Sequence, residues 1–219
     1  MHNRMKMRTD PATTAFLFLD FQYDVCKKGG GMVKNDPEIL DRFDQTIQTT
    51  AVFLKNLRNL DPQPLTIHVQ HEFTQNYPEL QKTVLSKMEQ SMLNSRSFES
   101  GREKTNIVSE LIPAPGEFLL KKHSLSVFAT TELSWMLNKH QVRTVVLSGV
   151  VTHYAVLAAA FSAYDSGLSV VVAQDCYMSG GLQMHETALK ILNPVSELSS
   201  STELLNGLIQ SSRKRRPEK

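Results

Sequence analysis

Residues 144–166 read TVVLSGVVTHYAVLAAAFSAYDS, and this stretch gives the clearest evidence for the fold class. Thr144–Ser148 is an apolar run typical of a buried strand, and a helix is predicted from His153 to Ser166. Unpaired N–H groups and the helix dipole make the turn between such elements a favoured place for reacting groups in α/β proteins. The first helical turn offers His153, Tyr154 and Ala155. Ala155 stands where a nucleophile is expected, yet its methyl group cannot attack a substrate.

The same alternation of strand and helix recurs along the chain. Buried-strand patterns occur at residues 15–19, 65–69, 118–120, 144–148 and 169–173, with a sixth near Val195. Helical patterns occur at residues 37–60, 78–93, 131–140, 153–166 and 182–192. Strands that alternate with helices build a parallel sheet covered on both faces. We therefore expect a Rossmann-like α/β fold with three layers, α/β/α, around a mainly parallel six-stranded sheet.

The length and the charge pattern predict one domain with two tails. A chain of 219 residues suits a single sizeable α/β domain. We expect a flexible N-terminal tail at residues 1–12, one folded domain at residues 13–208 and a basic C-terminal tail at residues 209–219. The basic run Arg213–Arg216 falls in the last of these.

Composition excludes several classes of function. The net charge is only +2, which argues against a nucleic-acid groove, since such grooves need a clustered basic face. Residues 1–10 lack the apolar core of a signal peptide, and no run approaches about 20 apolar residues, so no membrane span is expected. Cys26 and Cys176 have neither metal-site nor disulfide spacing. We expect a cytoplasmic protein that binds a small molecule, with neither nucleic acid nor membrane as partner.

Polar groups follow three of the predicted strands. Asp20 follows the first strand, Lys122 the third, and the turn 149–155 the fourth. Ligands of parallel sheets bind beyond the carboxyl ends of the strands, so these groups are expected to converge. Taken alone, Asp20 and Lys122 favour a structural ion pair at the sheet edge over a functional site.

Four motifs, taken in order, resemble the isochorismatase-like superfamily, also called cysteine hydrolases. The first is D-x-Q-x-D and the second is K…S-x-F. The third is a strand followed by G-V-x-T, and the fourth is a strand ending in Asp with a later His. The matching residues are Asp20, Gln22 and Asp24; Lys122, Ser126 and Phe128; Gly149, Val150, Thr152 and Val156; Asp175 and His185. The resemblance runs from about Ala15 to Leu192 and implies an isochorismatase-like hydrolase fold.

The resemblance also implies the catalytic positions Asp20, Lys122 and Ala155. Amidase members hold cysteine at the position of Ala155, where the thiol attacks an amide carbonyl. In those members the Asp takes the thiol proton and the Lys helps to hold the thiolate. Backbone N–H groups at the turn hold the oxyanion beside a cis peptide bond, which here would join Val150 and Val151. Without sulfur, the covalent route is closed.

Three interpretations of Ala155 remain open. In the first, the chain performs isochorismatase-type hydrolysis of a vinyl ether, in which a protonated Asp20 acts as the acid and no nucleophile is needed. Isochorismatases proper have a small residue at this position, and His153 matches their turn. In the second, the chain is a Cys-dependent amidohydrolase whose nucleophile was replaced by natural divergence or by an inactivating substitution, and Thr152 favours this pattern. In the third, it is a non-catalytic binding protein.

The expected substrate-binding residues come from two regions. Phe21, Phe73 and Phe128 are expected as apolar walls that raise the pKa of Asp20, and Gln22 is expected to orient Asp20 or the substrate. The turn is expected to add Val151, Thr152, His153 and Tyr154.

The two histidines at His68 and His71 do not suggest a metal site. Metal-binding members carry a D-x-H pattern after the second strand, and this chain lacks the aspartate at that offset. We expect His68 in the packing, His71 at a loop or rim, no metal and no organic cofactor. The alanine-rich helix at 158–163 corresponds to a region of subunit contacts in the family, so the resemblance implies a homo-oligomer, either a dimer or a tetramer.

Overall fold

The computed structural model describes residues 9–82 and 84–215 of the chain. Its strands form one six-stranded sheet, and every neighbouring pair that is described is parallel. The sheet order is β3-β2-β1-β4-β5-β6. The strands are β1 (Thr14–Leu19), β2 (Leu65–His71), β3 (Phe118–Lys122), β4 (Thr144–Val150), β5 (Ser169–Met178) and β6 (Glu197–Ser199). The predicted α/β fold is confirmed.

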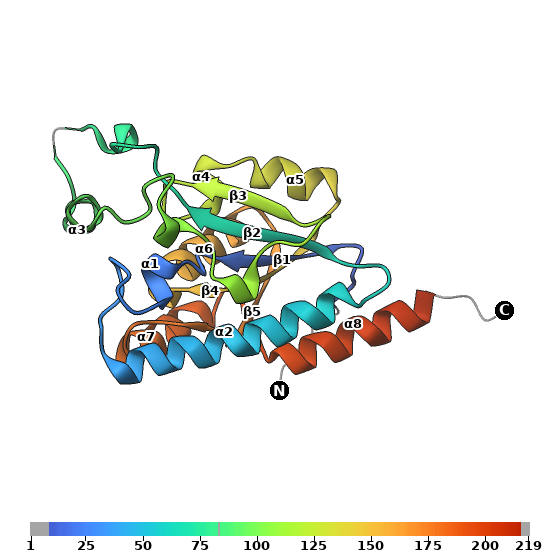
Figure 1. The fold of residues 1–219 in the computed structure, drawn as a ribbon. Helices are drawn as coiled ribbons and strands as arrows, with labels where there is room; N and C mark the ends of the chain where they lie inside the picture. Colours follow the sequence, from blue (N-terminus) through green and yellow to red (C-terminus); the bar gives the residue numbers. More distant parts are fainter. Residues whose placement is uncertain (1–8, 83, 216–219) are drawn as a thin grey trace.

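Helices cover both faces of this sheet (Figure 1). One face carries α2 (Pro37–Arg58) and α8 (Ser201–Arg215), which lie side by side. The other face carries α4 (Val127–Thr130), α5 (Leu133–Lys139), α6 (Leu157–Asp165) and α7 (Leu182–Leu192). The short α1 (Tyr23–Cys26) and α3 (Lys87–Ser95) lie beyond the carboxyl ends of the strands. Within the described part of the chain, no helix is both long and apolar enough to cross a lipid bilayer.

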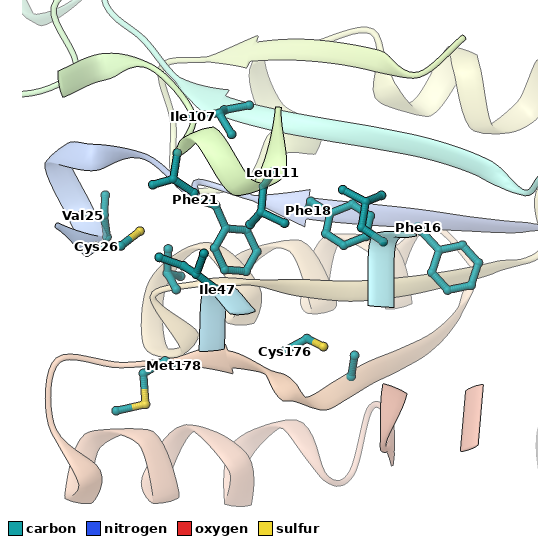
Figure 2. Close-up of a cluster of buried hydrophobic side chains, with 14 of the residues drawn as sticks. Phe16, Phe18, Phe21, Val25, Cys26, Ile47, Ile107, Leu111, Cys176 and Met178 are labelled. Carbon is teal, nitrogen blue, oxygen red and sulfur yellow. The ribbon is translucent and has the colours of Figure 1, made fainter. Parts of the chain in front are cut away.

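The central strand β1 is buried on both of its faces, as its continuous apolar sequence predicts. Phe16 and Phe18 enter the core cluster beneath α2, which also holds Ile47 (Figure 2). Leu17 and Leu19 point the other way, into the cluster beneath α6. Burying each phenylalanine contributes on the order of 1.5–3 kcal/mol. Successive side chains of β1 therefore pack alternately against the helices on one face of the sheet and those on the other.

The predicted extent of the helix at residues 78–93 is wrong. A 3₁₀ turn occupies Pro78–Leu80, and α3 begins only at Lys87. Ser86 starts it with a capping box: its hydroxyl accepts from the Glu89 N–H, while the Glu89 carboxylate accepts from the Ser86 N–H. This cap begins a separate helix, so the intervening residues stay outside it.

Near the C-terminus, α8 continues through residue 208, the predicted end of the domain, to Arg215. Asp175 anchors the first turn of α8 by accepting hydrogen bonds from the N–H and the hydroxyl of Ser201, at 2.8 and 2.7 Å. Further along α8, Ser211 donates to the carbonyl of Thr9. Residues 9–12 and 209–215 thus belong to the folded body. The rest of the expected tails, residues 1–8 and 216–219, lies outside the described residues.

Gly149 allows β4 to approach β1 closely where both strands end. It pairs with Leu19 and has a φ of +156°. A Cβ atom at this position would lie 2.6 Å from both the Cβ and the carbonyl oxygen of Leu19. The contact sets the spacing between Asp20, which follows Leu19, and the turn that follows Val150.

We predict that Gly149→Ala lowers the free energy of unfolding by about 1–3 kcal/mol, because the added methyl group overpacks the junction of two central strands. The matched control is Gly180→Ala, since an added Cβ there meets no atom within 4 Å. Chemical denaturation of both variants checks this prediction. Equal stability of the two variants would contradict it.

Candidate active site

Asp20 and Lys122 form a buried ion pair at the carboxyl ends of the strands. The Lys122 Nζ lies 2.7 Å from the Asp20 Oδ2, and the two residues are 1% and 6% exposed. Lys122 also donates to the carbonyls of Ser124 and Leu125 at 3.0 and 3.1 Å. Asp20 leaves β1 in the left-handed region, with a φ of 58°, a strained conformation that is common at functional sites. The fold thus brings together two residues that lie far apart in the sequence.

The environment of Asp20 favours proton exchange. Burial raises the pKa of the Asp20 carboxyl above its ordinary value of 3.8, and the Lys122 ammonium opposes that rise. One carboxylate oxygen, Oδ1, is buried without a hydrogen-bond partner. Asp20 therefore has one oxygen held by Lys122 and one without a hydrogen-bond partner among the described residues.

Lys121, the neighbouring lysine, faces solvent. Its Nζ lies 2.8 Å from Glu72, and its side chain is 55% exposed. Alternation along β3 therefore sends Lys122 into the site and Lys121 to the surface.

Ala155 lies at the turn between β4 and α6. A cis peptide bond joins Val150 and Val151, as the resemblance implies. A π-helical turn at Thr152–Val156 follows, and Ala155 within it is 3% exposed. The methyl group of Ala155 lines the same cavity as Asp20 and Lys122. One cavity therefore brings together Asp20, Lys122 and Ala155, the three positions that the resemblance implies.

A cavity of about 360 Å³ opens over these residues, within the usual size of small-molecule pockets. Three of the expected substrate-binding residues line it: Val151, His153 and Tyr154. Much of its remaining wall is apolar and comes from Val25, Phe43, Met88, Met92, Phe98 and Met184. The sequence did not identify these side chains individually, because α2, α3 and α7 bring them together from distant parts of the chain.

The other expected substrate-binding residues lie outside the cavity lining. Phe21 and Phe73 belong to the hydrophobic core beneath α2, and Phe128 packs against the opposite core cluster. Thr152 is hydrogen-bonded to His185, with 3.1 Å between Oγ1 and Nδ1. The three phenylalanines are therefore held in the core, and Thr152 is held by its hydrogen bond to His185.

Gln22 supports the site instead of lining it. Its amide nitrogen donates to the carbonyls of His71 and Thr105, at 2.8 and 2.6 Å. Its amide oxygen accepts from the His71 N–H at 2.8 Å. Gln22 therefore clamps the end of β2 against the segment that follows β1.

The expectation for His71 is wrong, whereas that for His68 is confirmed. His71 is the last residue of β2, is 5% exposed and lines the cavity. It pairs in register with Lys122, and β2 runs two residues beyond its predicted end. The position of His71 at a strand's carboxyl end was the signal available in the sequence. His68 is buried in the packing and bonded to Glu117 at 2.8 Å.

Neither cysteine lines the cavity. Cys26 and Cys176 are both buried core residues, and burial raises the pKa of the Cys26 thiol. Across residues 9–82 and 84–215, no three His, Cys, Asp or Glu side chains are grouped as metal ligands.

We predict that Lys122→Met lowers the free energy of unfolding at neutral pH by about 3–5 kcal/mol, because it leaves a buried carboxylate without its partner. Lys121→Met is the matched control, since it breaks an ion pair of similar length at the surface, where such pairs are worth about 0–1 kcal/mol. Chemical denaturation measures both. Similar losses in the two variants would contradict the burial argument.

The loss in Lys122→Met is also expected to depend on pH. Without the ammonium, the folded-state pKa of Asp20 lies further above its unfolded value. A raised pKa stabilises the folded state below the unfolded pKa, and this contribution is lost as the pH rises through the folded pKa. Relative to the unsubstituted protein, the variant should therefore be least destabilised at about pH 4 and increasingly destabilised as the pH rises to about 7. A loss that is constant with pH would exclude Asp20 as its origin.

A model of the isochorismatase domain family matches residues 14–203 of this chain. Among curated proteins, the uncharacterized isochorismatase family protein YaaI of Bacillus subtilis is 27% identical over 119 residues, which cover 54% of this chain and 62% of YaaI. The ureidoacrylate amidohydrolase RutB of Methylorubrum extorquens is 29% identical over 99 residues, which cover 45% of this chain and 40% of RutB. The matched region thus spans 40% to 62% of these two relatives.

Solved structures agree on the fold. The crystal structure of a cysteine hydrolase from Pseudomonas syringae pv. phaseolicola 1448A is similar with a TM-score of 0.80 and 16% sequence identity. The alignment covers 94% of this chain and 97% of that protein. The family match includes all six strands and the residues around the cavity. The chain therefore belongs to the isochorismatase family.

Proposed function

We propose that this protein is a small-molecule hydrolase in which Asp20 transfers a proton and no covalent intermediate forms. One observation carries the proposal: a buried carboxyl with a raised pKa, and with one oxygen that lacks a hydrogen-bond partner among the described residues, lines a cavity together with Ala155, where the resemblance implies a nucleophile. Acid catalysis needs a positioned proton donor, whereas covalent catalysis needs an attacking atom that Ala155 lacks. Membership of the isochorismatase family supports the hydrolase part of this proposal.

Vinyl-ether hydrolysis suits this set of groups. Asp20 gives its proton to the terminal methylene carbon, and the ether oxygen stabilises the resulting cation. Water adds to the cation and returns a proton to Asp20. The hemiketal then collapses to a carbonyl compound and an alcohol, so water is the only co-reactant. Lys122 stabilises the Asp20 carboxylate during the step in which it is charged, because its Nζ lies 2.7 Å away.

We predict that the protein hydrolyses a vinyl ether and that Asp20→Asn reduces kcat by about 10²–10⁴-fold, the usual contribution of general acid catalysis. The panel contains isochorismate, 2-phenoxyacrylate and phenyl vinyl ether, and release of the alcohol is followed by chromatography. Cys26→Ala is the control, because that thiol lies outside the cavity lining. Full activity of Asp20→Asn would overturn the proposal.

The second candidate is an amidohydrolase whose nucleophile has been replaced. It is favoured by the placement of Ala155, whose methyl group lines the cavity together with Asp20 and Lys122. A cysteine there would complete the set that the family's amidases use. The ureidoacrylate amidohydrolase relative makes C–N bond hydrolysis a relevant reaction to test.

We predict that Ala155→Cys hydrolyses no member of an amide panel that includes ureidoacrylate and nicotinamide, because the cavity is suited to a reaction without a nucleophile. Amide hydrolysis that appears only in Ala155→Cys would establish the second candidate. If neither protein turns over any substrate while a small molecule still binds, the chain is a binding protein. A cytoplasmic location and a dimer or tetramer remain predictions alongside this proposal.

A further inference from the structure

The buried charge of Lys122 is compensated by Asp20. The Lys122 side chain is 1% exposed, and its Nζ lies 2.7 Å from the Asp20 Oδ2. The ammonium also donates to the carbonyls of Ser124 and Leu125, which are dipoles without a net charge. A buried ion that has lost its counter-charge is strongly unfavourable. The empty site is therefore most stable with Asp20 in its charged form.

The proposed reaction requires the less favourable form of the site. Asp20 can protonate a substrate carbon only if it begins the reaction as the neutral acid. Burial raises the pKa of the Asp20 carboxyl, whereas the Lys122 ammonium opposes its protonation. A bound molecule with one negative charge removes this conflict, because it replaces Asp20 as the counter-charge of Lys122.

The other titratable groups around the cavity supply no negative charge. In the lining they are Lys34 before α2, His71 at the end of β2, and His153 and Tyr154 in the turn after β4. Burial lowers the pKa of both imidazoles, so they are neutral near pH 7, as a phenol is. In α1, burial raises the pKa of the Cys26 thiol, which is neutral as well. Among the described residues of the lining, Asp20 is the only carboxyl group.

The rest of the cavity favours an apolar molecule. Methionine side chains are flexible and polarisable, so they fit irregular apolar groups and aromatic rings closely. Four of them line the cavity: Met32, Met88, Met92 and Met184. Apolar walls also exclude water, so they strengthen the attraction between Lys122 and a nearby anion. A molecule with one anionic end and an apolar body matches both parts of this lining.

We propose that the cavity binds such an amphipathic monoanion and that its binding transfers one proton from the solvent to Asp20. The free site holds a carboxylate and an ammonium, and the complex holds the neutral acid, the ammonium and the anion. The anion compensates Lys122 through space, while the ammonium keeps its hydrogen bonds to two carbonyls. This inference rests on the proposed function in that it treats the neutral acid as the reactive form. The substrate itself thus brings Asp20 into the state that donates a proton.

Two unreactive probes of similar shape test the proposal by isothermal titration calorimetry. 2-Naphthoate carries one negative charge, and 2-naphthamide is its neutral counterpart. In buffers with different ionisation enthalpies at pH 7, we expect uptake of about one proton with 2-naphthoate and none with 2-naphthamide. The affinity for 2-naphthoate should fall by up to about ten-fold per pH unit between about pH 6 and pH 8, because the complex binds one proton more. The affinity for 2-naphthamide should not change over this range.

Asp20→Asn identifies the group that takes up the proton. Its amide has the shape of the neutral acid, and asparagine tolerates the left-handed backbone at this position. We expect the variant to bind 2-naphthoate at least about ten-fold more tightly at pH 7, without proton uptake, because Lys122 has lost its counter-charge. 2-Naphthamide should bind equally to both proteins. Lys34→Met is the matched control, since Lys34 is exposed and its charge is screened by water.

Five results would overturn the proposal. They are binding of neither probe, no proton uptake with 2-naphthoate, proton uptake that persists in Asp20→Asn, equal or weaker binding of 2-naphthoate by Asp20→Asn, and loss of its binding in Lys34→Met. The third result would assign the proton to a histidine. Because neither probe is hydrolysed, the titration is independent of the turnover assay. Turnover that is lost in Asp20→Asn, without proton uptake on binding, would support the hydrolase and overturn this inference alone.

Discussion

The buried ion pair between Asp20 and Lys122 is the constraint on which the site depends. Both charges are removed from water, and such burial is tolerated only when the partners meet closely and their remaining groups are bonded. Lys122 meets this condition, because it lies 2.7 Å from Asp20 and donates to two further carbonyls, whereas the Oδ1 of Asp20 has no hydrogen-bond partner among the described residues. Because Asp20 follows β1 and Lys122 ends β3, the pair also joins two strands that β2 separates.

Much of the fold was predictable because its signals are local. The apolar run of β1 and the strand-turn-helix pattern around Gly149 can be read without knowledge of their neighbours. Because ligands of parallel sheets bind beyond the carboxyl ends of the strands, the sequence was enough to place Asp20, Lys122 and Ala155 at that edge of the sheet. The helix α8 was missed because its anchor, the hydrogen bond from Ser201 to Asp175, links distant segments.

The walls of the cavity were not predictable for the same reason. Phe21, Phe73 and Phe128 are near the motifs in sequence, but each packs into a core cluster. The residues that do form the wall, such as Met92 and Phe98, belong to the segment around α3, where no motif marks them. Composition near a motif identifies apolar residues, and only the packing decides which of them face the cavity.

The structure also changes the meaning of Ala155. Beside the Asp20–Lys122 pair, its methyl group belongs to a cavity lining that is largely apolar. The central claim is that Asp20 protonates a substrate carbon and water completes the reaction. The most direct test is hydrolysis of phenyl vinyl ether in D₂O, with NMR analysis of the acetaldehyde before solvent exchange. The account predicts one deuterium in the methyl group, whereas release of an undeuterated methyl group would contradict it.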